Sequence, residues 1–117
     1  MREIRFRAWD KIDKTMCIST SHIETWFEMK NRYELMQFTG LLDKNGKEIY
    51  EGDIVLAGEE DIHAKVEWTG QNNLLGFCLV DKTSVFDIRD FAHRNLREYT
   101  TLQIIGNIYE HSHLLKN

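Results

Sequence analysis

The stretch QFTGLLDKNGKEIYEGDIV, residues 37–55, decides the fold that we expect for this chain. Asn45-Gly46 is a strong signal for a tight turn, because both residue types tolerate the positive φ that such a reversal needs. Gly52 supplies a second such point just before residues 54–57, an apolar run short enough to be a buried strand. We expect Asp53 to accept backbone N–H groups in this turn. Two turns so close together predict a compact β corner with a structural role.

The chain before this corner predicts a hairpin and an irregular segment. Residues 3–8 alternate between apolar and charged side chains, which is the pattern of a half-buried strand, and residues 15–19 can return as the second arm. In residues 20–34, Ser21 and Glu24 fit a helix-capping box, and Ile23, Trp26 and Phe27 would share a helical face. The same residues also suit a strand. We therefore expect either a short helix or an irregular excursion here.

After the corner, the periodicity predicts further strands and one more helix. Residues 62–68 alternate most clearly, residues 74–80 are almost continuously apolar, and residues 102–109 return to strand character. Residues 87–99 have the period of an amphipathic helix, which Asp87 could cap. Four aromatic residues lie on the expected apolar strand faces, and we expect most of them to be in the core: Trp9, Trp68, Phe77 and Tyr109.

Short, closely spaced strands of this kind predict a mainly β fold. We expect a small SH3-like barrel, or a strongly bent sheet, with one or two short helices. It would be built around residues 35–80 and completed by the N-terminal hairpin and the C-terminal strand. At 117 residues, the chain is expected to form a single domain spanning residues 1–117.

Composition argues against several classes of protein. No apolar run is long enough to span a bilayer and the N-terminus is charged, so we expect no membrane contact, no signal peptide and a cytoplasmic location. The net charge of −4 argues against a general polyanion binder. Cys17 and Cys78 are far apart and lack CxxC spacing, so we expect free, mostly buried thiols.

Three blocks of sequence resemble the YopX-like proteins of phages and prophages of Gram-positive bacteria. They are RFRAWD at residues 5–10, the central residues 35–41 with 43–55, and IGNIYE at residues 105–110. The resemblance implies a mainly β architecture related to SH3-type barrels, a phage or prophage origin, and residence in the bacterial cytoplasm. It implies no reaction, so no catalytic residue is carried over.

The residues themselves give no catalytic or metal site. His111 and His113 are the only histidines close together in sequence, and no cysteine accompanies them. There is no nucleophile elbow and no phosphate-binding loop, and the acidic run at residues 59–61 is typical of solvated charge. We therefore expect no cofactor, no metal and no enzymatic activity.

The remaining hypothesis is a non-enzymatic accessory protein that binds an unidentified protein partner or a second copy of itself. Its expected contact residues are apolar side chains without an evident place in the core: Trp26, Phe27, Leu114 and Leu115. The alternative is a nucleic-acid-binding module, whose expected contacts are Arg89, His93, Arg94 and Arg97. Asp90 and Glu98 flank Arg94 at four-residue spacing, which favours an ordinary solvated helix face over a phosphate-binding one.

Overall fold

The computed structural model describes residues 5–18, 23–58, 62–69, 76–81, 84–91 and 101–115. Its elements, in chain order, are β1 (Phe6–Asp10), β2 (Thr15–Cys17), α1 (Ile23–Glu28), β3 (Tyr33–Leu42), β4 (Glu48–Tyr50), β5 (Asp53–Ala57), β6 (Ile62–Thr69), β7 (Gly76–Val80), β8 (Val85–Asp87), a 3-10 turn (Ile88–Asp90), β9 (Gln103–Asn107) and a second 3-10 turn (Ser112–Leu115). The predicted mainly β class is confirmed.

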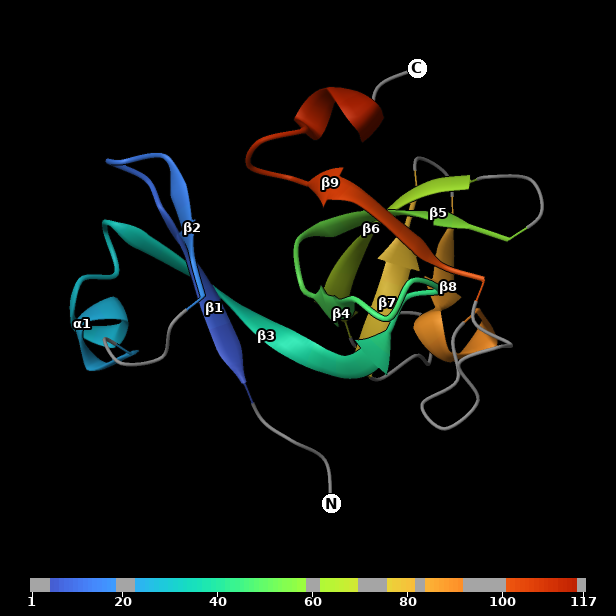
Figure 1. Cartoon of the computed structure of the whole chain (residues 1–117), viewed down its shortest axis with the longest axis horizontal. Coiled ribbons are helices and arrows are strands. Elements are labelled where there is room, and N and C mark those ends of the chain that lie inside the picture. Colours follow the sequence, from blue (N-terminus) through green and yellow to red (C-terminus); the bar gives the residue numbers. More distant parts are fainter. Residues whose placement is uncertain are drawn as a thin grey trace.

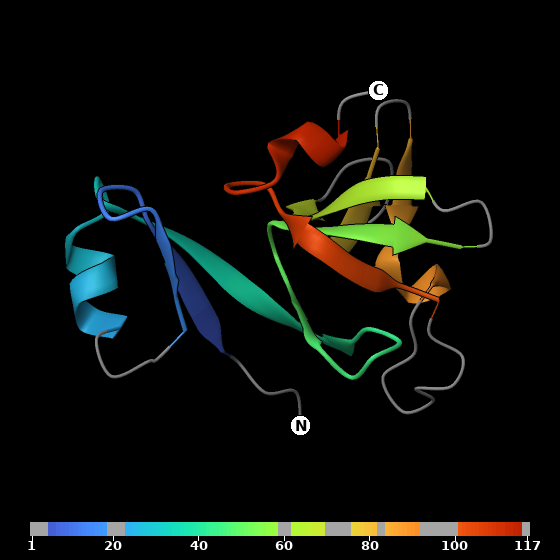
Figure 2. The ribbon, with the colours of Figure 1, turned by 45° about the horizontal axis from the view of Figure 1, so that its top comes forward.

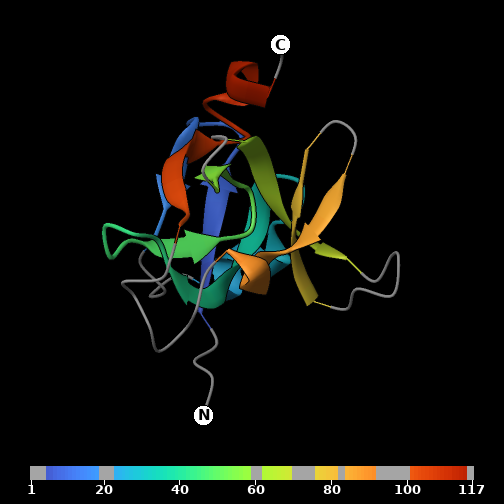
Figure 3. The same ribbon diagram turned by 90° about the vertical axis from the view of Figure 1, so that its right-hand side faces the viewer.

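The strands form two antiparallel sheets, in the orders β2-β1-β3-β4 and β8-β7-β6-β5-β9. Figure 1 shows β1, β2 and α1 together on one side of the molecule, which we call the N-terminal lobe. Strands β4–β9 lie on the other side, which we call the barrel lobe, and the long β3 runs from one to the other. Figure 2 shows the same division from a second angle, and Figure 3 shows the five-stranded sheet curling upon itself.

The N-terminal hairpin differs from expectation in its burial and its partners. It pairs with β3, where Ala8 lies opposite Leu35, and so belongs to the four-stranded sheet. The predicted half-buried strand is buried on both faces, since Ala8 and the neighbouring Arg7 are only 0% and 9% exposed. Arg7 is covered because its side chain reaches the barrel lobe, where it hydrogen-bonds Asp53.

The main core lies in the barrel lobe, where the inner faces of both sheets meet. Its members come from β3 to β7, from the 3-10 turn Ile88–Asp90 and from the residue just before β9: Leu41, Ile49, Val55, Ala57, Ala64, Val66, Phe77, Leu79, Ile88 and Leu102. Burying each valine, leucine, isoleucine or phenylalanine side chain of this core stabilises the fold by about 1.5–3 kcal/mol. The predicted core positions of Trp9 and Phe77 are confirmed. Of the other two aromatic residues in that group, Tyr109 is half-buried and Trp68 is 52% exposed.

A buried aspartate joins the turn between β3 and β4 to the start of β9. Asp43 is fully buried, and its Oδ1 accepts hydrogen bonds from the backbone N–H groups of Asn45 and Lys47. Its Oδ2 accepts from Ile104 N–H, and Lys44 N–H donates to Leu102 O at 2.8 Å. The carboxylate thereby satisfies three backbone donors that would otherwise be buried without partners.

The two predicted turns are confirmed in outline. Gly46 and Gly52 have φ values of +84° and +85°, in the left-handed region that favours glycine. Asn45 does not share this conformation, since Lys14 is the only non-glycine with positive φ among the described residues. Asp53 Oδ2 accepts a 2.8 Å hydrogen bond from Tyr50 N–H, as expected of a turn aspartate.

The helical predictions have mixed outcomes. The segment after the hairpin contains a short helix, α1, and Asp87 caps the 3-10 turn Ile88–Asp90 by accepting from Arg89 N–H. Most of the predicted helix lies outside the described residues, as do residues 74 and 75 of the predicted strand. Both cysteines are free, with Cys78 buried and Cys17 half-buried. No helix in the described part of the chain has the length and apolar character to cross a membrane.

Candidate functional site

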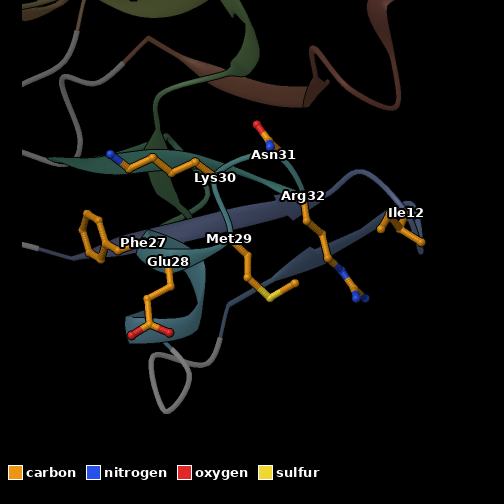
Figure 4. Close-up of a pocket in the computed structure, with 7 residues that line it drawn as sticks. All are labelled: Ile12, Phe27, Glu28, Met29, Lys30, Asn31 and Arg32. Carbon is orange, nitrogen blue, oxygen red and sulfur yellow. The ribbon is translucent and has the colours of Figure 1, made fainter.

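Three large apolar side chains are exposed around one groove of the N-terminal lobe. Ile12, Phe27 and Met29 are 67%, 46% and 44% exposed. They line a groove of about 490 Å³ together with Glu28, Lys30, Asn31 and Arg32. Figure 4 shows Met29 between Phe27 on one side and Ile12 on the other. We call this surface the lobe groove.

Phe27, near the end of α1, and Met29, just after it, are both exposed. Trp26 is directed into the lobe and is only 3% exposed, whereas the adjacent Phe27 is 46% exposed, with its ring edge-on to Phe6 at 6.1 Å. Met29 N–H closes the helix on Thr25 O. Arg32 N–H and Tyr33 N–H then both donate to Met29 O, which forms a tight turn after the helix. Met29 is therefore held at the outside of a turn.

An ion pair connects the two segments that border the lobe groove. Arg32 donates to Asp10 through Nε at 3.1 Å and Nη2 at 2.8 Å. Asp10 Oδ1 also accepts from Ile12 N–H and Asp13 N–H, which fixes the turn that presents Ile12. The hydrogen bonds from Arg32 outweigh the effect of burial and lower the pKa of Asp10 to about 2. The Asp10–Arg32 ion pair therefore fixes the two segments that border the groove relative to each other.

A second charged pair joins the two lobes. Arg7 Nη2 donates to Asp53 Oδ1 at 2.8 Å, and both side chains are buried. The Arg7 guanidinium also lies over the ring of Tyr50, 4.7 Å from its centroid. Burial raises the pKa of Asp53, and the charge of Arg7 opposes that shift.

An aromatic stack is the second contact that joins the lobes. The rings of Trp9 in β1 and Tyr109, after β9, stack with centroids 5.4 Å apart. Tyr109 is itself half-buried. Its pKa is raised, first by burial and then by the charge of Glu34. Together with the Arg7–Asp53 pair, this stack ties β1 to the barrel lobe at two places.

The structure does not bring the four expected apolar contact residues together. Trp26 was expected at a contact surface, and this prediction is wrong, because its indole packs inside the N-terminal lobe and is 3% exposed. Phe27 is exposed at the lobe groove. Leu114 and Leu115 are half-buried in the 3-10 turn Ser112–Leu115, where His63 Nδ1 donates to Leu114 O. Figure 1 places that turn beside the barrel lobe, far from α1.

Two residues of the lobe groove were missed by sequence analysis. Ile12 interrupts the charged turn at residues 10–14, and an isolated apolar residue in a polar turn was the signal available for it. Met29 follows a helix whose end the sequence does not mark with glycine or proline, so nothing indicated that it would be exposed.

The expected nucleic-acid contacts are only partly described. His93, Arg94 and Arg97 lie outside the described residues. Arg89 is exposed and forms hydrogen bonds with both carboxylate oxygens of Asp87. The other described arginines also pair with acidic side chains: Arg5 with Glu48, Arg7 with Asp53, and Arg32 with Asp10 and Asp13.

The histidine pair near the C-terminus has a structural contact. Asn107 N–H donates to His111 Nδ1 at 3.1 Å, within the turn that follows β9. The rings of His111 and His113 are 6.4 Å apart between centroids. Within the described ranges, no three histidine, cysteine or acidic side chains gather in a geometry that could hold a metal ion.

Comparison with known proteins identifies a protein family and solved structures with a similar fold. The family model described as YopX protein matches residues 17–116. The crystal structure of protein EF1440 from Enterococcus faecalis has a TM-score of 0.63 and 23% sequence identity, and the alignment covers 99% of this chain and 100% of that one. At that identity the likeness concerns the fold alone. No curated protein matches the sequence.

Proposed function

The chain belongs to the YopX protein family, and we propose that it is a non-enzymatic phage or prophage accessory protein that associates with a second copy of itself through the lobe groove. The observation that carries this proposal is the exposure of Ile12, Phe27 and Met29 around one groove. Large apolar residues gathered in this way on a small protein mark a contact surface more often than chance exposure does.

The charges beside the groove favour a second copy as the occupant. Glu28 and Lys30 are exposed, and neither forms an ion pair within the described residues. Figure 4 shows both side chains on the Phe27 side of Met29, with Glu28 extending below it and Lys30 above it. In a two-fold contact, the same patch meets itself in reversed orientation, so Glu28 of one copy would face Lys30 of the other. The groove is therefore self-complementary in charge as well as apolar.

Nucleic-acid binding has less support. The described arginines already face carboxylates, so a phosphate would have to displace an existing partner in each case. The function would then rest on His93, Arg94 and Arg97, which lie outside the described residues. Binding that falls steeply with added salt would favour this alternative, because phosphate contacts release counterions and apolar contacts do not.

The test is light scattering coupled to gel filtration over a wide concentration range. The parent is expected to change from monomer to dimer as concentration rises. Ile12→Ser should raise the dissociation constant about tenfold or more, because a two-fold contact loses the side chain twice. Ile18→Ser is the matched control, since Ile18 is as exposed as Ile12 and does not line the lobe groove.

Charge exchange gives a second, independent readout. Glu28→Lys should weaken the dimer, and adding Lys30→Glu should restore it, because the exchanged pair is again complementary. A parent that stays monomeric at all concentrations would refute self-association. Equal effects of Ile12→Ser and Ile18→Ser would show that the dimer uses another surface.

A further inference from the structure

A second cleft lies between β3 and β6, where the two lobes meet. It has a volume of about 330 Å³ and is lined by Leu35 and Met36 of β3, Glu51 and Gly52, residues 66–68 of β6, and Ile108 and Tyr109. Gly52 connects two of the segments that line this cleft. The Gly52 N–H donates to Val66 O at 2.9 Å, and the Gly52 carbonyl accepts from Ile108 N–H at 2.8 Å. We call it the interlobe cleft.

One wall of the interlobe cleft is an open strand edge. Phe38 N–H donates to Arg5 O, and Lys11 N–H donates to Arg32 O. The backbone N–H and C=O groups of even-numbered residues in this part of β3 therefore point toward β1, and those of odd-numbered residues point away from it. Gln37 is paired there with Glu51, whose N–H donates to Gln37 O. Leu35 is the next odd residue toward the start of β3, and its N–H and C=O have no partner within the described residues.

The other wall is also an open edge. Val66 O accepts from Gly52 N–H, so the backbone of Val66 faces β5. Backbone groups alternate in direction along a strand, so those of Trp68 face the same way. Strand β5 begins at Asp53 and pairs with β6 only as far as Lys65, which leaves the Trp68 edge unpaired on that side in the described part of the chain. The cleft is therefore bordered by two short unpaired strand edges, one at Leu35 of β3 and the other at Trp68 of β6.

The side chains of the cleft combine an exposed indole with carboxylates. Trp68 is 52% exposed and contacts Phe77 edge-on at 5.0 Å. The Glu51 carboxylate accepts from Gln37 N–H through Oε1 and forms no ion pair with a described side chain, while the Glu51 carbonyl accepts from Arg7 Nη2 at 3.2 Å. Glu67 is half-exposed and pairs with Lys65 at the surface. Burial is the main cause of the raised pKa of Tyr109, the charge of Glu34 adds to it, and the charge of Arg7 opposes the smaller effect of Glu51.

We propose that the interlobe cleft binds an extended polypeptide segment of a partner protein that carries lysine or arginine. The backbone of the segment would pair with the open edge at Leu35 or Trp68, as in β-strand addition. Its cationic side chain would lie over the Trp68 ring and near Glu51, where cation–π and charge attraction act together. This site is separate from the lobe groove, and its binding does not depend on self-association.

The test uses two labelled peptides of equal length, Thr-Lys-Val-Arg-Thr-Lys-Val and Thr-Glu-Val-Glu-Thr-Glu-Val, in fluorescence anisotropy titrations of the full chain. The basic peptide is expected to bind and the acidic one is not. Trp68→Ala should weaken binding about tenfold. Glu51→Gln should weaken it about threefold, because it removes the charge while leaving an oxygen to accept from Gln37 N–H.

Two control variants distinguish peptide binding at the interlobe cleft from nonspecific charge attraction. Glu24→Gln removes an exposed carboxylate of α1 that does not line the cleft, and it should leave the affinity unchanged. Ile12→Ser should also leave it unchanged, so failure of the lobe groove proposal would not affect this result. The inference is overturned if both peptides bind equally, if neither binds at millimolar concentration, or if Trp68→Ala binds the basic peptide as well as the parent does.

Discussion

Arg7 of β1 and Asp53 of β5 form a buried ion pair, with 2.8 Å between Nη2 and Oδ1, that connects the two sheets of the molecule. The two residues are 46 positions apart in sequence. The same carboxylate receives Tyr50 N–H through its other oxygen, at 2.8 Å. Asp53 therefore orders its own turn and provides the counterion for an arginine of the other lobe.

Asp53→Asn tests the role of this pair in stability. Asparagine keeps an acceptor for Tyr50 N–H and removes the negative charge, which leaves the Arg7 guanidinium buried without a counterion. We expect a loss of about 3–5 kcal/mol in the free energy of unfolding, measured by urea denaturation. Adding Arg7→Met should recover part of that loss, because the unpaired charge is then gone. A single variant within about 0.5 kcal/mol of the parent would contradict this account.

The Asp10–Arg32 pair predicts a specific pH dependence. The pKa of Asp10 is lowered from 3.8 to about 2 in the folded protein, chiefly by hydrogen bonds from Arg32. A lowered carboxyl pKa contributes stability that is complete above the unfolded-state value and is lost as pH falls through the folded-state value.

Arg32→Gln isolates this contribution. We expect the stability difference between the parent and this variant to be constant above about pH 4 and to shrink between about pH 4 and pH 2. Urea denaturation of both proteins at several pH values measures it, and the comparison removes the titration of other carboxylates. A difference that stays the same down to pH 2 would show that the pair does not perturb Asp10.

Gly52 combines a left-handed backbone with a close neighbour. Its φ is +85°, and a Cβ at this position would lie 2.9 Å from Met36 Sδ. Gly52→Val should cost about 1–3 kcal/mol of stability through backbone strain, with crowding against Met36 in addition. Gly58→Ala is the comparison, because Gly58 also has positive φ, at +72°, while its Cβ would approach the nearest atom only to 3.4 Å. Melts of the Gly52 variant that superimpose on the parent would refute the prediction.

Local sequence signals predicted the two turns of the corner at residues 37–55 and strands β5 and β6, but no strand was predicted over β3 or β4. The turn at Gly46, the bend at Gly52 and the alternation along β6 each depend on neighbouring residues, so a single sequence contains them. The division into two lobes was not predictable in this way. It depends on Arg7 meeting Asp53 and on Trp9 stacking on Tyr109, and alternation within β1 cannot indicate what covers its charged face.

The contact surface was only partly predictable for a related reason. Trp26 and Phe27 are adjacent on a helix, and nothing in the sequence indicates which of them faces the lobe interior. The structure shows that the larger indole is buried and the phenyl ring is exposed. Ile12 and Met29 join Phe27 only because the Asp10–Arg32 pair brings the hairpin turn beside the loop after α1. Such a surface exists only in the folded chain.

The most direct test of the proposed function is the concentration dependence of methyl NMR signals of Ile12 and Met29. Self-association through the lobe groove predicts that both signals shift progressively as the protein is concentrated, while those of Ile18, exposed outside the groove, and Leu79, buried in the core, stay in place. Signals of Ile12 and Met29 that do not move from micromolar to millimolar concentration, or that move no more than that of Ile18, would contradict the proposal.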